Sequence, residues 1–460
     1  MPISMLPVKT LWQNHGKKGV LQTMSVMIRR YPALFLCVFL AVTMPCSARA
    51  MSLEDVIDHV YEHSPSVAAA RAERDAIAEL YPQAMAGWHP SLSAETGIYK
   101  TKIDNSNFAG ATGTTTKEIG LHLEQPLFRG GRTMADTARA RHLIRASQAD
   151  YHGIRQDIIL RTVTVYMDVI RDRALHELHR ANRRRLQAAM DAAEKRFAAG
   201  AITRTDINQA TMRLSRAQAD EIAADNDLAG SLAAFAQLTG FPAPEDMTFP
   251  SERLILPDTL QEALAIAERD HPSLHAAQAV EKAAQADIKT ARSATLPQID
   301  AYATYNRQYD PQPGLVNRSE SKTAGLRATM ALYQGGAVRS RIREAAQQAR
   351  RHQYDTTHHA SIVARNVETH WHHWQAARRE AETRRREIDA ARDARDGVEA
   401  ETAMGARTVL DMLDAEQELL NARTALTRAR RNKTVESYTL LQRIGHLHPH
   451  PAPYTPPSDP

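Results

Sequence analysis

The sequence is poor in cysteine, in aromatic residues and in long hydrophobic runs. Of its 460 residues only two are cysteine, Cys37 and Cys46, and both lie near the N-terminus. Their position excludes a disulfide framework or a cysteine-ligated zinc site in the rest of the chain. Aromatic residues make up 5% of the sequence, and its 20 glycines and 22 prolines exclude collagen-like and low-complexity proteins. The length accommodates about two to four globular domains.

The strongest apolar run covers residues 31–46 and has the features of an export signal. An arginine pair precedes it, and an A-x-A site at 48–50 follows it. A basic flank, a short apolar stretch and a small-residue site are typical of a secretory signal peptide, which we predict at 1–50 with cleavage after Ala50. The run is shorter than the roughly 20 apolar residues of a membrane-spanning helix. An N-terminal membrane anchor is the alternative.

Removal of this segment changes the charge balance of the chain. The first 50 residues contain six basic and no acidic residues, so the formal net charge falls from +5 to −1. The basic excess therefore belongs to the predicted signal, and no nucleic-acid partner is expected.

A lipid-modified Cys46 is a weaker alternative to simple cleavage. The start codon, Met1, Met24 or Met27, stays open.

The rest of the chain is an internal duplication. Landmark residues recur in order, each 205 to 207 positions after its first copy: Pro65 as Pro272, Pro90 as Pro297, Gly130 as Gly335, Gly200 as Gly405 and Asp206 as Asp411. This period is far longer than that of a solenoid repeat. We predict two structural repeats, 51–250 and 251–445, followed by a Pro/His-rich tail at 446–460 that is disordered or, alternatively, laid along the outside.

Each repeat is predicted to contain a helix, a β-hairpin and a long helical hairpin. Alternating apolar residues around turn-rich connectors predict β-hairpins at 91–128 and 298–333. Proline-free tracts rich in alanine and arginine predict helical hairpins at 132–239 and 337–444. The longer helix of each is about 100 Å at 1.5 Å per residue. A further helix precedes each β-hairpin, at Ser66–Ala86 and at Ser273–Ser293.

The four predicted strands raise the question of a membrane. An open sheet edge is not stable in lipid because its backbone groups lack partners, and four strands cannot close into a barrel. The strands have the weak alternation that transmembrane barrels show, so a barrel shared among copies of the chain is one interpretation. A soluble sheet with one face covered by a helix is the other.

Five segments contain the most distinctive landmarks: 123–132 (LEQPLFRGGR), 332–336 (LYQGG), 89–92 (HPSL), 296–298 (LPQ) and 405–415 (GARTVLDMLDA). Together they resemble the TolC-like outer-membrane channel family, also called outer-membrane efflux or secretion factors. The resemblance covers the chain from the predicted cleavage site to about Gly445. A single Gly-Gly turn is weak evidence, whereas ordered landmarks in two copies are specific.

This resemblance implies an α+β membrane protein that forms a homotrimer. Four strands per chain would contribute to a shared 12-stranded transmembrane β-barrel in outer-membrane lipid. The long antiparallel helices would form a trimeric α-barrel in the periplasm. A periplasmic adaptor and an inner-membrane transporter, ABC-type or proton-driven, would deliver substrate for efflux or type I secretion. Such a duct is not an enzyme and needs no cofactor.

The resemblance also assigns roles at the turns between helices. Gly200 and Gly405 are predicted at the hairpin tips that contact the adaptor. Asp411 and Asp414, three residues apart and therefore on one helix face, would form the constriction of the periplasmic entrance. A three-fold ring of carboxylates attracts cations and excludes anions. Taken alone, such a pair is more often simply a solvated helix face.

A latch and two chain reversals complete the predicted site. The resemblance assigns Arg407 to a latch that pairs with Thr205 and Asp206 on the neighbouring hairpin. Thr402 stands where the best-known member has a tyrosine, so a second latch contact is not expected. The strand-to-helix turns are predicted at two glycine pairs, Gly130 with Gly131 and Gly335 with Gly336.

A histidine-rich stretch between residues 358 and 373 suggests metal binding but does not establish it. His370 and His373 share a helix face, yet no carboxylate or further ligand is placed by spacing. We interpret the histidines as solvated and the neighbouring aromatics as packing, and the metal question stays open.

The rival function is a soluble periplasmic coiled-coil adaptor or scaffold without a pore. The substrate is undetermined.

Overall fold

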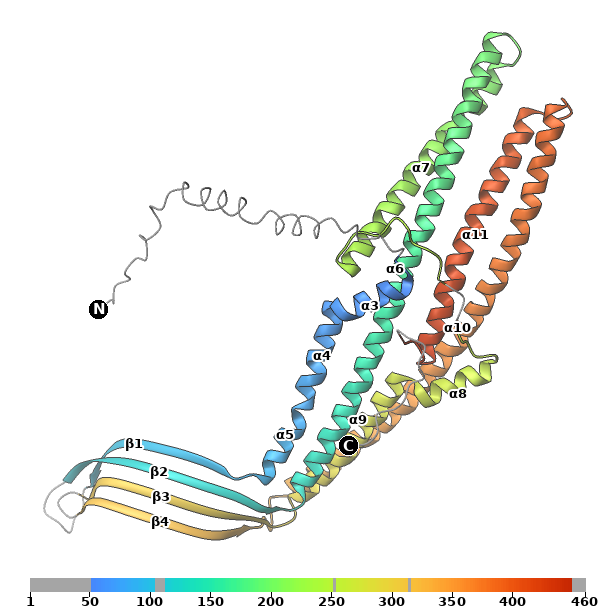
Figure 1. Ribbon diagram of the computed structural model, residues 1–460. Helices are drawn as coiled ribbons and strands as arrows, with labels where there is room; N and C mark the ends of the chain where they lie inside the picture. The colour runs from blue at the N-terminus through green and yellow to red at the C-terminus, as the bar shows by residue number, and fades with distance from the viewer. Residues whose placement is uncertain (1–50, 104–111, 251–253, 313–315, 449–460) are drawn as a thin grey trace, which may run out of the picture. The chain divides into compact units, whose positions relative to one another are not determined.

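The computed structural model describes residues 51–103, 112–250, 254–312 and 316–448 (Figure 1). The predicted signal peptide, 1–50, and the last part of the predicted tail, 449–460, lie outside these residues. Within the described ranges, no helix has both the length and the apolar character that crossing a membrane requires.

The two repeats have the same order of main elements. In the first repeat these are α3 (Leu53–His63), α4 (Pro65–Ala78), α5 (Leu80–Met85), η1 (Ala86–Trp88), β1 (Ser91–Ile103), β2 (Thr112–Arg129), α6 (Arg132–Ala198) and α7 (Arg204–Thr239). In the second they are α8 (Leu260–Asp270), α9 (Pro272–Ser293), β3 (Gln298–Gln312), β4 (Val316–Thr329), α10 (Ala337–Ala403) and α11 (Val409–Arg443). Both long helices, α6 and α10, have 67 residues.

Three details differ from the sequence-based expectation. The helix expected at Ser66–Ala86 is interrupted at Glu79, between α4 and α5. Pro82 explains the break, because its ring clashes with the carbonyl four residues earlier and its nitrogen cannot donate a hydrogen bond. Strand β4 ends at Thr329, short of the expected end at residue 333. The short amphipathic helices α3 and α8 at the start of each repeat were not anticipated.

The four strands form one antiparallel sheet in the order β1-β2-β3-β4. The two hairpins join through β2 and β3, where Leu121 pairs with Tyr305. On the outer pairs, Leu92 faces Leu123 and Ala301 faces Leu326. Because side chains alternate across a sheet, these residues all lie on one face. Strands β1 and β4 are the two edges, and no strand among the described residues pairs with their outer sides.

The apolar face of this sheet is exposed. Leu92 is 70% exposed, Ile98 72% and Leu326 72%, and Ile119 and Leu121 are also exposed. The opposite face is polar: Ser93, His122, Thr304 and Thr323 follow one another across the four strands. Removing this apolar surface from water would stabilise the protein by about 25 cal/mol for each Å² that is buried. Among the described residues, no helix packs extensively on this sheet, unlike the helix-covered sheet that the sequence left open as an alternative.

The helices pack around α6 and α9. Helix α7 returns along α6 and α11 returns along α10, while α9 contacts both α6 and α10 (Figure 1). The core is alanine-rich along α9 and has larger side chains along α6, where Val163, Tyr166 and Met167 are all 0% exposed. At the position 205 residues after Tyr166, Trp371 of α10 is 5% exposed. The two repeats therefore bury an aromatic ring at the same place.

The long helices differ in how much they bury. Helix α6 buries twenty side chains, whereas α10, of the same length, buries seven. The difference arises because α6 contacts α3, α4, α5, α7, α9 and α11, whereas α10 contacts only α8, α9 and α11 among the described elements that it packs on extensively. Helix α9 packs on α10 as α4 and α5 pack on α6, but no described element packs on α10 as α9 of the second repeat packs on α6 of the first.

The start of the predicted disordered tail is ordered, which corrects the expectation for residues 446–448. Leu447 is 2% exposed and Ile444 1%. Gln156 Nε2 donates a hydrogen bond of 2.7 Å to the Gly445 carbonyl, and His446 Nε2 lies 2.7 Å from Asp270 Oδ2. The chain after α11 is therefore held against α6 and the end of α8.

Asp270 makes this anchoring sensitive to acid. Hydrogen bonds from Arg269 and from His446 lower the pKa of Asp270 to about 2. A lowered folded-state pKa adds stability above the ordinary aspartate pKa, and that stability is lost as the pH falls towards 2. We expect Asp270→Asn to reduce the free energy of unfolding by on the order of 1–2 kcal/mol at pH 7 and by little near pH 2.

Thermal unfolding of the two proteins across this pH range measures the difference. Glu268→Gln, a change at an exposed carboxylate two residues away, is the matched control. A deficit of the same size at pH 7 and near pH 2 would contradict the role of the Asp270 charge.

Candidate functional site at the helical hairpin tips

Both helical hairpins turn at the predicted glycines. Gly200 (φ 73°) and Gly405 (φ 80°) adopt the left-handed conformation directly after α6 and α10. The following amides reach back into the helices: Ala201 N donates to Arg196 O at 2.8 Å, and Ala406 N donates to Glu401 O at 2.9 Å. This bonding satisfies carbonyls at a helix end and favours glycine at the reversal.

Each tip continues into a reciprocal capping box. Thr408 Oγ1 and Thr408 N donate to Asp411 Oδ2 at 2.8 and 3.0 Å, and Asp411 N donates back to Thr408 Oγ1 at 3.2 Å. Thr203 and Asp206 repeat this arrangement at the start of α7. These boxes were not predicted, although the spacing Thr-x-x-Asp is their signature.

The boxes also fix the charge of both aspartates. Hydrogen bonds from the side chain and backbone of Thr408, and the nearby Arg407 charge, lower the pKa of Asp411. Bonds from the backbone and side chain of Thr203 lower the pKa of Asp206 in the same way. Each turn therefore holds a carboxylate that is ionised at neutral pH.

Asp414 has a different environment from Asp411. It lies one helical turn further along α11, and its Oδ1 accepts a hydrogen bond of 2.7 Å from Arg213 Nη2 of α7. Its side chain is 65% exposed, whereas that of Arg213 is 24% exposed. Asp414 therefore links the second hairpin to the first. The first repeat has Gln209 at the equivalent position.

Arg407 pairs within its own hairpin. Its Nε lies 3.0 Å from Glu401 Oε2, and both side chains are about half exposed. Asp206 is bonded to its own cap residue, and within the described residues no hydrogen bond or ion pair joins Arg407 to Thr205 or Asp206. The predicted latch stays a prediction.

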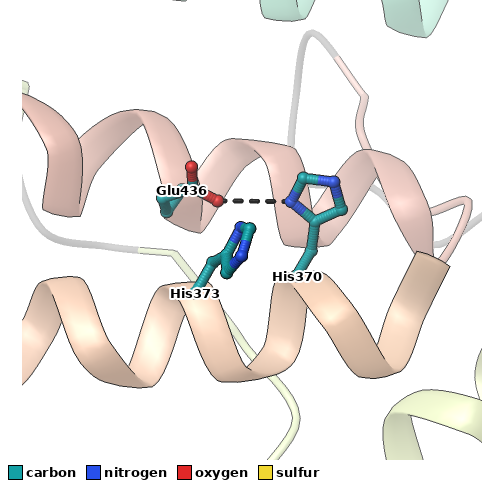
Figure 2. A group of neighbouring side chains, drawn as sticks. All are labelled: His370, His373 and Glu436. Carbon is teal, nitrogen blue, oxygen red and sulfur yellow. Dashed lines mark hydrogen bonds and ion pairs between the residues drawn. The ribbon is translucent and has the colours of Figure 1, made fainter. Parts of the chain in front are cut away.

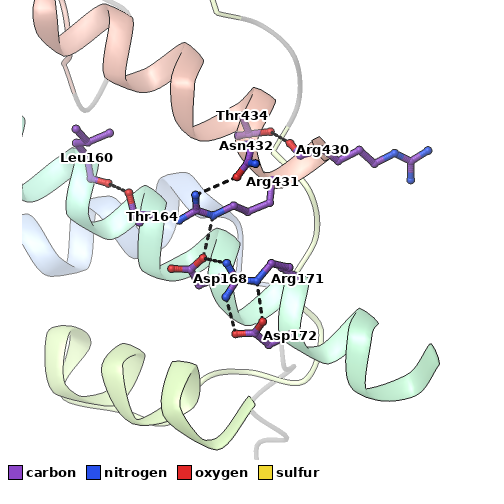
Figure 3. A network of polar contacts seen from close by, with 9 residues as sticks. All are labelled: Leu160, Thr164, Asp168, Arg171, Asp172, Arg430, Arg431, Asn432 and Thr434. Atoms are coloured by element: carbon purple, nitrogen blue, oxygen red, sulfur yellow. Dashed lines mark hydrogen bonds and ion pairs between the residues drawn. The ribbon is translucent and has the colours of Figure 1, made fainter. Parts of the chain in front are cut away.

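Below the tips, two ionic networks connect the repeats. Glu416 of α11 pairs with Arg185 of α6 and with Arg395 of α10, the latter at 3.5 Å. Further along α6, Asp168 accepts hydrogen bonds from Arg171 at 2.7 Å and from Arg431 of α11 at 2.9 Å (Figure 3). Neither network was predicted, because each depends on residues more than 200 positions apart.

The second network includes a deeply buried charge. Asp172 is 3% exposed, and Arg171 forms a forked pair with its two carboxylate oxygens at 2.7 and 2.9 Å (Figure 3). A buried carboxylate needs such pairing to offset its lost hydration. Arg171 therefore joins Asp168 and Asp172 along one side of α6, and Arg431 extends the network to α11.

The sequence profile of the family described as "Outer membrane efflux protein" matches residues 56–241 and again residues 263–446. The chain belongs to the outer membrane efflux protein family. The two matched stretches begin 207 residues apart and end 205 residues apart, as the landmarks of the two repeats do. The resemblance to TolC-like channels is thereby confirmed.

Relatives in this family match most of the chain. The outer membrane efflux protein BepC of Brucella suis is 28% identical over 403 residues, which are 87% of this chain and 87% of BepC. The outer membrane protein TolC of Vibrio cholerae is 24% identical, covering 88% of this chain and 93% of TolC. The proteases secretion protein PrtF of Dickeya chrysanthemi is 25% identical, covering 83% and 85%.

Solved structures have the same fold. The outer membrane protein VceC of Vibrio cholerae superposes with a TM-score of 0.72 at 19% identity, covering 85% of this chain and 96% of VceC. The Campylobacter jejuni outer membrane channel CmeC gives a TM-score of 0.75 at 14% identity, covering 86% and 85%. At these identities the match concerns the fold.

The different bonding of the two tip aspartates can be tested by hydrogen exchange. Asp411→Ala removes the carboxylate that accepts hydrogen bonds from Thr408 N and Oγ1, so the amides of residues 408–412 should exchange faster. Asp414→Ala removes only an exposed ion pair, which is worth about 0–1 kcal/mol, and should leave these amides protected. Exchange measured by mass spectrometry near neutral pH resolves the two variants. Equal protection in both would contradict the capping role of Asp411.

Proposed function

We propose that this member of the outer membrane efflux protein family is one subunit of a trimeric exit duct in the outer membrane. A periplasmic adaptor and an inner-membrane transporter deliver substrate to it, and the duct conducts that substrate passively. The open, apolar-faced sheet is the observation that carries the proposal. Relatives named for efflux, BepC, and for protease secretion, PrtF, support the two kinds of system in which such a duct works.

The sheet edges favour closure by copies of the chain. With four antiparallel strands, β1 and β4 run in opposite directions, so β4 of one copy can pair antiparallel with β1 of the next. Three copies give a 12-stranded barrel, an even number as bacterial barrels have. The strands have 13 to 18 residues, more than the roughly 9–11 that cross a bilayer.

The two faces of the sheet suit such a barrel. The face with Leu92, Ile98 and Leu326 would contact lipid, and the face with Ser93 and Thr304 would line water. Transmembrane barrels have this alternation of apolar and polar side chains. The alternative, a soluble periplasmic adaptor or scaffold, would leave the same apolar side chains in water.

The unequal repeats support a ring as well. Leu127 and Phe128 are 48% and 40% exposed, whereas their second-repeat counterparts Leu332 and Tyr333 are both 87% exposed. In the first repeat, a Cβ atom on Gly130 would lie only 2.5 Å from the carbonyl oxygen of Ser293. The equivalent Gly335 has open space, although its φ of 57° is similar. In the ring, the α4–α5 layer of the next copy would occupy the open space beside Gly335 and would cover α10.

The tips then form the periplasmic entrance. In a trimer, Asp411 and Asp414 recur three times around the axis and constitute the constriction. Arg407 acts as the latch towards Thr205 and Asp206. The turns at Gly200 and Gly405 are the surfaces for the adaptor. Exposed ion pairs are worth only about 0–1 kcal/mol, so an adaptor that prefers the open state can release them.

Assembly and conduction test the proposal directly. The mature protein, purified in detergent, should run as a trimer by native mass spectrometry and should form ion-conducting channels in a planar bilayer. Both properties follow from a sheet that closes only between copies. A protein that stays monomeric without detergent and passes no current would refute the duct and favour the scaffold.

Channel recordings test the entrance residues separately. Arg407→Ala should raise single-channel conductance because the latch is lost. The double change of Asp411 and Asp414 to Asn should weaken block by divalent cations because the ring charge is removed. Glu194→Gln, at an exposed carboxylate of α6, is the control and should change neither property. Unchanged current and unchanged block in the test variants would remove the gate assignment while leaving the duct intact.

A further inference from the structure

Three possible metal ligands converge between α10 and α11. His370 and His373 project from one side of α10, and Glu436 faces them from α11 (Figure 2). His370 Nδ1 lies 3.3 Å from Glu436 Oε2, and the two imidazole rings meet edge to face with centroids 5.4 Å apart. One ligand atom from each residue can be chosen so that all lie within 4.8 Å of one another.

The surrounding packing fixes the backbone of this cluster. Next to His370, Trp371 is 5% exposed and packs against Trp374, with ring centroids 5.2 Å apart. On α11, Val435 is 8% and Leu440 0% exposed, so the turn that carries Glu436 is anchored. The two helices therefore present the cluster from fixed positions.

The ligands remain within reach of solvent. The side chains of His370 and Glu436 are 24% and 27% exposed, and His373 is exposed. An ion can therefore enter without unfolding the hairpin. The exposed His373 ring is also the member best placed to rotate towards an ion.

The donor set is that of a borderline divalent transition metal. Zinc accepts imidazole nitrogen at about 2.0–2.1 Å and carboxylate oxygen at about 2.0–2.2 Å, so ligand atoms around one ion lie about 3–4 Å apart. The His370–Glu436 separation already fits, and a small rotation of His373 closes the rest. We propose that His370, His373 and Glu436 bind a divalent transition metal ion such as Zn²⁺, with the remaining coordination positions held by water.

Only the second repeat has this donor set. The positions 205 residues earlier are Val165, Asp168 and Ser231. Asp168 is used differently, since it accepts hydrogen bonds from Arg171 and Arg431 (Figure 3). The site therefore occurs once in the described part of the chain. A bound ion would link α10 to α11 and restrict sliding between the two helices of this hairpin. The proposal does not depend on the exit-duct function.

Zinc titration of the untagged, chelator-treated full-length mature protein tests the site. Isothermal titration calorimetry should find one tight Zn²⁺ site per chain. Loss of one of three ligands, in His373→Ala or Glu436→Gln, should weaken binding by at least about tenfold. His358→Ala, at an exposed histidine on the same helix, should leave the affinity unchanged. Circular dichroism establishes that each variant is folded.

Two further readouts separate this site from the histidines near the C-terminus. Bound Zn²⁺ should raise the unfolding temperature of the wild-type protein but not that of His373→Ala, because only an intact site links the helices. Zinc-edge X-ray absorption should report two imidazoles with oxygen donors. Tight binding that survives both His373→Ala and Glu436→Gln, or no tight binding at all, would overturn the proposal.

Discussion

A strand at the edge of a sheet leaves alternate backbone N–H and C=O groups without partners, and this constraint governs the architecture of the chain. Strands β1 and β4 both have such an edge, and the apolar face between them is uncovered. Among the described residues, the helices pack on one another and cover neither the edges nor the apolar face. In the proposed duct the missing partners are further copies of the chain, and an even number of antiparallel strands makes such a copy geometrically suitable.

The same incompleteness appears among the helices. Duplication gave two long helices of equal length, but α6 packs on elements of both repeats, whereas α10 packs extensively only on elements of its own repeat. Among the described elements, none contacts α10 as α9 contacts α6. In the proposed ring, the next copy would supply this neighbour.

Much of the fold could be predicted from the sequence because its signals are local or periodic. The glycine pairs, the proline-free tracts and the constant offset between copies predict the long helices and the hairpins. The break at Glu79 was missed although Pro82 signals it. The burial of Leu447 could not be predicted, because it depends on which surface of α6 and α8 lies nearby. Among the site residues, the Thr408–Asp411 box has a readable spacing. The Arg213–Asp414 pair and the approach of Glu436 to His370 depend on how separate helices face each other.

The tip of the second hairpin uses one carboxylate for two purposes. Asp411 Oδ2 terminates the turn through Thr408, and in the proposed duct the same group faces the permeation path. Ion preference and mechanical integrity are thus coupled at residue 411, whereas Asp414 has no part in the cap. In such an entrance, a substitution at residue 414 changes the charge without removing the cap. A substitution at residue 411 changes both. The first repeat, which has Gln209 at the position equivalent to 414, keeps its Thr203–Asp206 cap without a second carboxylate.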